Sequence, residues 1–146
     1  MNPPSPPPID MNVYGESCET ALVAVVGTQT VNIQGRDSLV PIPAQCNSGT
    51  FGTDLGVDMW YTFDSSSTWS MDTCDASGVD TSIVVYTGSC DNLVLYDCNG
   101  DGNDLNGCQQ YYSHITNIPA GQYKIRIGQY NGGSASATND MTINTN

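Results

Sequence analysis

Short stretches in which apolar and polar residues alternate recur along this chain. In the stretch 122–127, Tyr123, Ile125 and Ile127 fall on one side, and Lys124 and Arg126 fall on the other. A period of two predicts β-strands with one face in a core, and the Gly, Asn, Asp and Ser residues between stretches predict turns. The expected strands are 21–26, 30–34, 57–63, 68–72, 82–86, 93–96, 110–115, 122–127 and 141–144. No stretch has a convincing helical period.

Regular strand spacing over 146 residues predicts one all-β domain. We expect an antiparallel, jelly-roll-like β-sandwich of about eight to nine strands, stabilised by disulfide bonds. The domain should span residues 16–146, and residues 1–15 should form a proline-rich N-terminal arm. Met59, Tyr61 and Phe63 share one parity, and Trp60 is expected to be buried in the core.

The charge balance narrows the possible partners. Fifteen acidic residues against three basic ones give a formal net charge of −12. Nucleic acid and anionic membranes are disfavoured, because almost nothing can neutralise phosphates. Insertion into a membrane is not expected, because the sequence has no long apolar run. Bound divalent cations would relieve the self-repulsion of so acidic a domain.

Six cysteines form an even set without a C-x-x-C pair, which favours disulfides over zinc. They are Cys18, Cys46, Cys74, Cys90, Cys98 and Cys108. Six cysteines allow about 15 pairings, and we expect Cys18–Cys46, Cys74–Cys108 and Cys90–Cys98. Disulfides predict a secreted protein, extracellular or at the cell surface. The first residues lack the apolar core of a signal peptide, so Met1 need not be the native start.

Oxygen-bearing side chains at alternate positions form a candidate calcium loop at 97–104. The ligands expected there are Asp97, Asn99, Asp101, Asn103 and Asp104, with Gly102 at a tight turn. An EF-hand is excluded, because Cys108 stands where the bidentate Glu belongs and the preceding residues are strand-like. An exposed turn has the same composition, but we favour Ca²⁺.

Six fragments, taken in order, resemble the pre-peptidase C-terminal (PPC)-like β-sandwich modules of secreted bacterial proteins. They are 16–21, 57–63, 72–74, 79–90, 97–101 and 120–128. The resemblance covers about residues 16–144 and implies a jelly-roll-like sandwich that often binds calcium and has no catalytic activity. It places Asp80 among the metal ligands beside Asn99 and Asp101. This chain has Gly100 where the family more often has an acid, and Asp97, Asn103 and Asp104 can compensate.

Other chemistries are less well supported. The turn Asp80-Thr81-Ser82 resembles one half of an aspartic protease site, but a second such turn is absent. His114, the sole histidine, has no G-x-S-x-G motif to serve and fits a sheet surface. The acidic residues show no spacing that indicates a glycosidase pair. We therefore expect no enzyme activity.

Two functions of different classes remain. The first is a structural subunit of an extracellular fibre or surface layer, a homopolymer of this chain. Residues 3–8 contain five of the eight prolines, and such a segment cannot join a central strand. We expect this arm to dock on a neighbouring copy, where Ile9, Met11, Val13 and Tyr14 can add an edge strand.

The second function is polysaccharide binding, as an accessory module of a secreted enzyme. Aromatic side chains can stack on sugar rings. The possible platforms are Trp69, Tyr111, Tyr112 and Tyr130, although half-buried strand aromatics look the same without a ligand.

Overall fold

The computed structural model describes residues 15–33, 40–46, 58–74, 80–100, 112–129 and 137–146. In these ranges the strands are β1 Leu22–Val23, β2 Gly27–Ile33, β3 Asp58–Ser65, β4 Trp69–Asp72, β5 Thr81–Thr87, β6 Val94–Asn99, β7 His114–Ile118, β8 Gly121–Gln129 and β9 Ala137–Thr145. Two short 3-10 helices, η2 Cys18–Thr20 and η3 Ala44–Cys46, complete the described elements.

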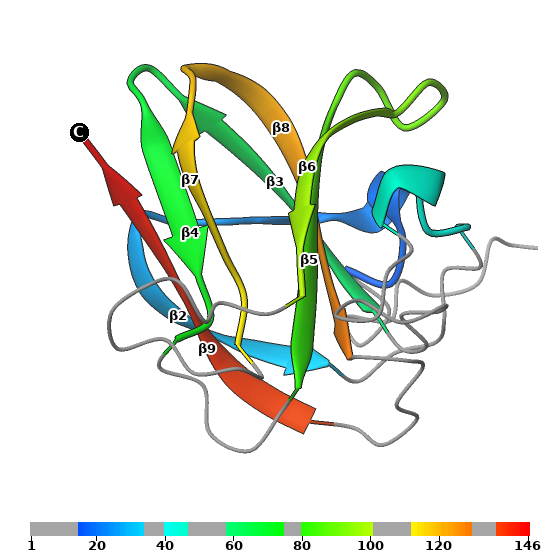
Figure 1. The fold of residues 1–146 in the computed structure, drawn as a ribbon, viewed down its shortest axis with the longest axis horizontal. Helices are drawn as coiled ribbons and strands as arrows, with labels where there is room; N and C mark the ends of the chain where they lie inside the picture. The colour runs from blue at the N-terminus through cyan, green and yellow to red at the C-terminus, as the bar shows by residue number, and fades with distance from the viewer. Residues whose placement is uncertain (1–14, 34–39, 47–57, 75–79, 101–111, 130–136) are drawn as a thin grey trace, which may run out of the picture.

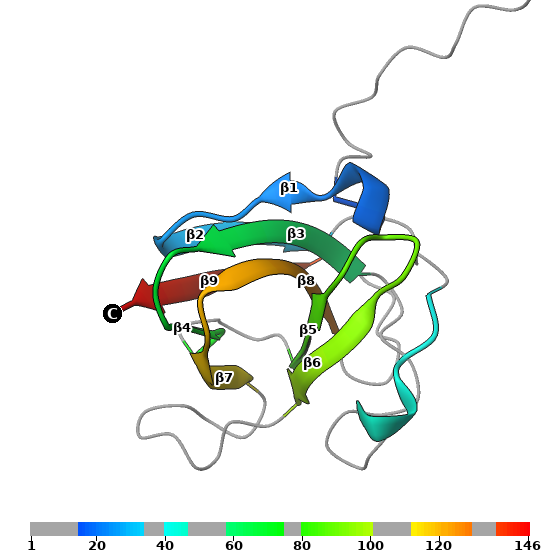
Figure 2. The same ribbon diagram turned by 90° about the horizontal axis from the view of Figure 1, so that it is seen from above.

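The strands form two sheets packed face to face (Figures 1 and 2). One sheet has the order β1-β3-β8-β5-β6, and the other has the order β2-β9-β4-β7. The chain changes sheet at every connection except the β5–β6 hairpin. From β2 to β9 this alternation is a jelly roll, which confirms the predicted fold class. Strand β1 is an extra strand outside the jelly roll, because it pairs with β3 in parallel.

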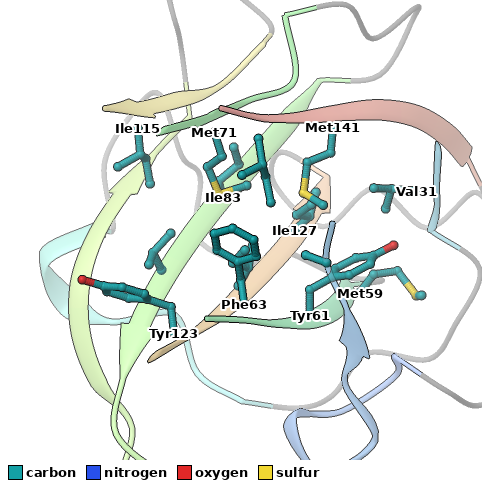
Figure 3. Packing of buried hydrophobic residues seen from close by; sticks show 14 of the residues in the cluster. Val31, Met59, Tyr61, Phe63, Met71, Ile83, Ile115, Tyr123, Ile127 and Met141 are labelled. Carbon is teal, nitrogen blue, oxygen red and sulfur yellow. The ribbon is translucent and has the colours of Figure 1, made fainter. Parts of the chain in front are cut away.

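The main core lies between the two sheets. Met59, Tyr61 and Phe63 enter it from β3, as their parity predicts (Figure 3). Met71 and Met141 enter from the opposite sheet. Because Tyr61 is buried here, the pKa of its phenol rises to about 12. The alternating residues of the sequence therefore point alternately into the core and toward the outer face of the sheet.

The five-stranded sheet is buried on its outer face as well. Trp60, Val84 and Tyr86 form a second apolar cluster there, beneath the η2 and η3 segments. As a result, the first six residues of β5 are all buried. We call residues 18–21 and 40–46, which lie over this cluster, the outer cover. The sequence correctly predicts that Trp60 is buried, but Trp60 belongs to this second cluster.

Several strand boundaries differ from the predicted ones. β7 begins at His114, whereas the sequence predicts a strand over 110–115, of which 110 and 111 lie outside the described residues. β1 ends at Val23, because the chain then crosses to the other sheet and begins β2 at Gly27. β6 continues to Asn99, past its predicted end at Tyr96.

The disulfides join the outer cover to the β5–β6 hairpin. Cys18 is bonded to Cys90, and Cys46 is bonded to Cys98. The predicted pairs Cys18–Cys46 and Cys90–Cys98 are therefore wrong. Cys90 lies in the hairpin turn, and roughly 13 Å of extended strand separates the start of β6 from Cys98. A disulfide needs Cα atoms within about 7 Å.

The third predicted pair has one described member. Cys74 is disulfide-bonded, and Cys108, the partner that the sequence predicts for it, lies outside the described residues. Disulfides form and persist in an oxidising compartment. The disulfides therefore support an oxidising environment outside the cell. No helix in the described ranges is long and apolar enough to cross a membrane.

Candidate functional site

Four strand ends meet at one end of the sandwich. β4 ends at Asp72, β5 begins at Thr81, β6 ends at Asn99 and β7 begins at His114. Their pairing partners place all four at the same end (Figure 1). The segments 75–79 and 101–111, outside the described residues, connect these strands. Two of the described residues predicted to bind calcium lie at this end, Asn99 at the end of β6 and Asp80 just before β5.

A cluster of buried hydroxyl groups holds these strand ends together. The Thr73 and Thr81 hydroxyl oxygens lie 2.6 Å apart. Ser113 donates its hydroxyl to the Thr81 carbonyl at 2.7 Å and its N–H to the Thr73 hydroxyl at 3.0 Å. All three residues are fully buried. Because buried polar groups that satisfy one another hold a fixed geometry, this cluster fixes the ends of the three strands relative to one another.

The predicted calcium ligands fall partly on this end. Asp97 and Asn99 lie on strand β6 rather than in a loop, because β5 pairs with them through Val85 and Ile83. Asp97 is exposed, and its carboxylate accepts the Cys98 N–H at 2.7 Å. Asn99 is half-buried, and its side-chain oxygen accepts the N–H of His114 at 3.1 Å.

Of the four remaining predicted ligands, the structure describes one. Asp80 directly precedes β5 and is half-buried. Asp101, Asn103 and Asp104 lie outside the described residues. Within the described ranges, no group of three or more His, Cys, Asp or Glu side chains is placed to hold a metal ion. The calcium site stays a prediction that depends on the 101–104 segment.

The structure corrects one proposed sugar platform. Trp69 is only 1 % exposed and lies between the sheets, with Phe63 at 4.7 Å and Tyr123 at 5.3 Å between ring centroids. It cannot stack on a ligand, because its face of β4 points into the core. Tyr112 is half-buried. Tyr111 and Tyr130 lie outside the described residues.

Strand β1 and the segment that follows it expose apolar side chains. Val23, Val25 and Val26 are 73 %, 52 % and 58 % exposed. The Ala24 N–H donates to the Thr62 carbonyl of β3 at 2.9 Å. Because successive backbone groups of a strand point to opposite sides, the N–H and C=O of Val23 point away from the sheet. The sequence places a strand here but does not show that its valines are left uncovered.

Sequence reasoning also missed a buried ion pair under the outer cover. Arg126 and Asp58 are both fully buried, and Arg126 Nε donates to Asp58 Oδ2 at 2.6 Å. Arg126 Nη2 donates to the Val40 carbonyl at 2.7 Å, and the guanidinium lies over the Trp60 ring, 5.3 Å from its centroid. Burial raises the pKa of Tyr86, and the nearby Arg126 charge partly offsets this rise.

In comparisons with known proteins, no family model, curated protein or solved structure matches this chain. The resemblance to PPC-like modules therefore stays a prediction. The jelly roll agrees with the fold that the resemblance implies, but one fold serves many functions.

Proposed function

We propose that this protein is a non-catalytic extracellular assembly subunit, in which the arm of one copy pairs with the β1 edge of the next. The observation that supports this proposal is the exposure of Val23 on the edge strand β1 and of Val25 and Val26 just beyond its end. An exposed apolar edge is a template for pairing with another chain, and proteins that stay monomeric usually protect such edges. Here the donor and acceptor groups of Val23 are the template.

The arm has the sequence of a strand that could be added. Ile9, Met11 and Val13 alternate with polar residues, so they share one face of an extended segment. The prolines precede this segment and leave its backbone donors intact. Such a segment can supply main-chain hydrogen bonds to an open edge and apolar side chains to its valines.

The base of the arm is fixed close to this edge. The Gly15 carbonyl accepts the N–H of Trp60 on β3 at 2.7 Å, and β1 pairs with the next two residues of β3. The fourteen residues before Gly15 can span at most about 50 Å when extended. That length is enough to reach a neighbouring copy. Whether a ring or an open filament results depends on the rotation between copies.

Calcium is the second part of the proposal. We assign Asp80, Asp97, Asn99 and the 101–104 segment to one site or to neighbouring sites. Hard cations with six to eight oxygen ligands suit this composition. Bound Ca²⁺ would also reduce the self-repulsion of a domain whose net charge is −12. Its expected role is to stabilise the loops that the Thr73–Thr81–Ser113 cluster anchors.

Replacing Val23 and Val25 by lysine should abolish assembly and leave the domain folded. Ammonium groups on the edge strand and just beyond its end block pairing, while substitutions at exposed sites usually change stability by no more than about 0.5 kcal/mol each. Deleting residues 1–12 should have the same effect. Sedimentation velocity with 1 mM calcium (about the level of extracellular fluids) measures the assembly state.

The matched control is Val94→Lys together with Tyr96→Lys. These residues are 52 % and 39 % exposed on β6, the opposite edge of the same sheet. This variant has the same added charge, so it should still assemble. A full-length chain that stays monomeric at high concentration, or a β6 variant that loses assembly equally, would refute the proposed role of the β1 edge.

Removing calcium should lower the melting temperature, and adding it back should restore it. At 100 times the Kd a ligand stabilises the folded state by about 2.7 kcal/mol, which is roughly 5–10 °C for a domain of this size. Asp101→Ala should reduce this shift, whereas Asp91→Ala, at an exposed turn residue outside the proposed site, should not. Identical melting curves with calcium and with chelator would exclude the site.

A further inference from the structure

A polar groove of about 420 Å³ lies on the outer face of the five-stranded sheet. Thr62 and Asp64 of β3 and Gln122 and Lys124 of β8 form its floor, and the turn 88–90 between β5 and β6 lines it as well. The turn needs glycine at 88, where φ is +88° and a Cβ would collide with the Asn92 carbonyl. Ligand sites commonly have volumes of about 300–1,000 Å³.

The four floor residues lie at neighbouring positions on the outer face of the sheet. Thr62 is paired with Lys124, and Asp64 is paired with Gln122. Neighbours across the strands are about 5 Å apart between Cβ atoms, and neighbours along a strand are about 6.7 Å apart. All four point away from the core, because the residues between them on the two strands, Phe63 and Tyr123, point into it.

These four side chains have no partners in the described part of the chain, where they make no side-chain hydrogen bond or ion pair. The four-stranded sheet differs. On its outer face the Thr28 and Thr142 hydroxyls lie 2.9 Å apart, and Thr30 donates to Asp140 at 3.2 Å. Polar groups of the groove are thus available for a ligand, whereas these four residues of the opposite sheet bond to one another.

The chemistry of the floor selects the class of ligand. Asp64 contributes one negative charge and Lys124 one positive charge, so the floor has no net charge. Thr62 and Gln122 can each donate and accept hydrogen bonds. Such a set suits a ligand that is uncharged and carries closely spaced hydroxyl groups, each of which also donates and accepts. We propose that this groove binds a neutral polysaccharide, a function beyond assembly.

Affinity electrophoresis of the full chain can test this proposal. The probes are three neutral polymers, hydroxyethyl cellulose, soluble starch and galactomannan, and the anionic polymer alginate. We expect at least one neutral polymer to retard the protein and alginate to have no effect. Asp64→Ala and Gln122→Ala should each raise the Kd for the neutral polymer roughly tenfold, because each removes a hydrogen-bonding group from the site.

The matched controls are Glu19→Ala, an exposed acid on η2, and Asn32→Ala, an exposed polar residue on the other sheet. Both should bind as tightly as the unchanged chain. Tryptophan fluorescence checks that every variant is folded, because Trp60 and Trp69 are both buried. Failure of all three neutral polymers to bind would overturn the proposal. So would stronger retardation by alginate, or equal binding by the Asp64 and Gln122 variants.

Discussion

Replacing Asp58 by alanine should lower the free energy of unfolding by about 3–5 kcal/mol. Arg126 is fully buried, and Asp58 is the carboxylate that pairs with it. Without Asp58 the guanidinium keeps the Val40 carbonyl and the Trp60 ring as neighbours, but neither carries a compensating charge. A buried charge without a counter-charge is among the most destabilising changes known in folded domains. Urea unfolding measures the loss.

A paired replacement separates the cost of an unpaired charge from the cost of losing packing. Asp58→Leu combined with Arg126→Met removes both charges and keeps apolar volume under the outer cover, so its loss should be clearly smaller. Glu19→Ala, an exposed acid on η2, should change stability by no more than about 0.5 kcal/mol. A loss below about 1 kcal/mol for Asp58→Ala would show that Arg126 is hydrated in solution.

The strands were predictable because their information is local. Alternation along β3 and β8 identifies which residues face the core, and the structure confirms the inner set of Met59, Tyr61 and Phe63. The ends of β6 and β7 were not predictable. Asp97 and Asn99 favour a turn by composition, but pairing with the apolar residues of β5 draws them into a strand. Tertiary pairing outweighs such local preferences.

The outer cover was beyond sequence reasoning, because it brings together segments far apart in the chain. Arg126 alternates with core residues, so the sequence predicts an exposed cation. In the structure the outer cover lies over it, and the Val40 carbonyl accepts from its guanidinium. The same arrangement determines the disulfides. The outer cover, which contains Cys46, lies beside the β5–β6 hairpin and so brings Cys46 next to Cys98. Trp69 was misassigned for a related reason: its Ser and Thr neighbours suggest exposure, whereas its own face of β4 points into the core.

Replacing Cys46 and Cys98 by alanine should cost about 4 kcal/mol and should loosen the outer cover before the sandwich unfolds. The two cysteines are 52 residues apart, and in the loop-entropy account a closed loop of this length stabilises by about 4 kcal/mol. The bond also anchors the segment whose Val40 carbonyl accepts from Arg126. Urea unfolding gives the total loss, and acrylamide quenching without denaturant reports the cover, because Trp60 lies beneath it.

The second disulfide provides the matched control. Cys18 and Cys90 are 72 residues apart, so loop entropy alone predicts a slightly larger loss, by roughly 0.3 kcal/mol. If the Cys46 segment also shields Arg126, removing Cys46–Cys98 should cost more, despite its shorter loop. It should also expose one tryptophan to acrylamide, and Trp60→Phe in the same variant should remove that signal. If both tryptophans stay shielded and the Cys18–Cys90 variant loses more stability, the cover is held by its apolar contacts rather than by this bond.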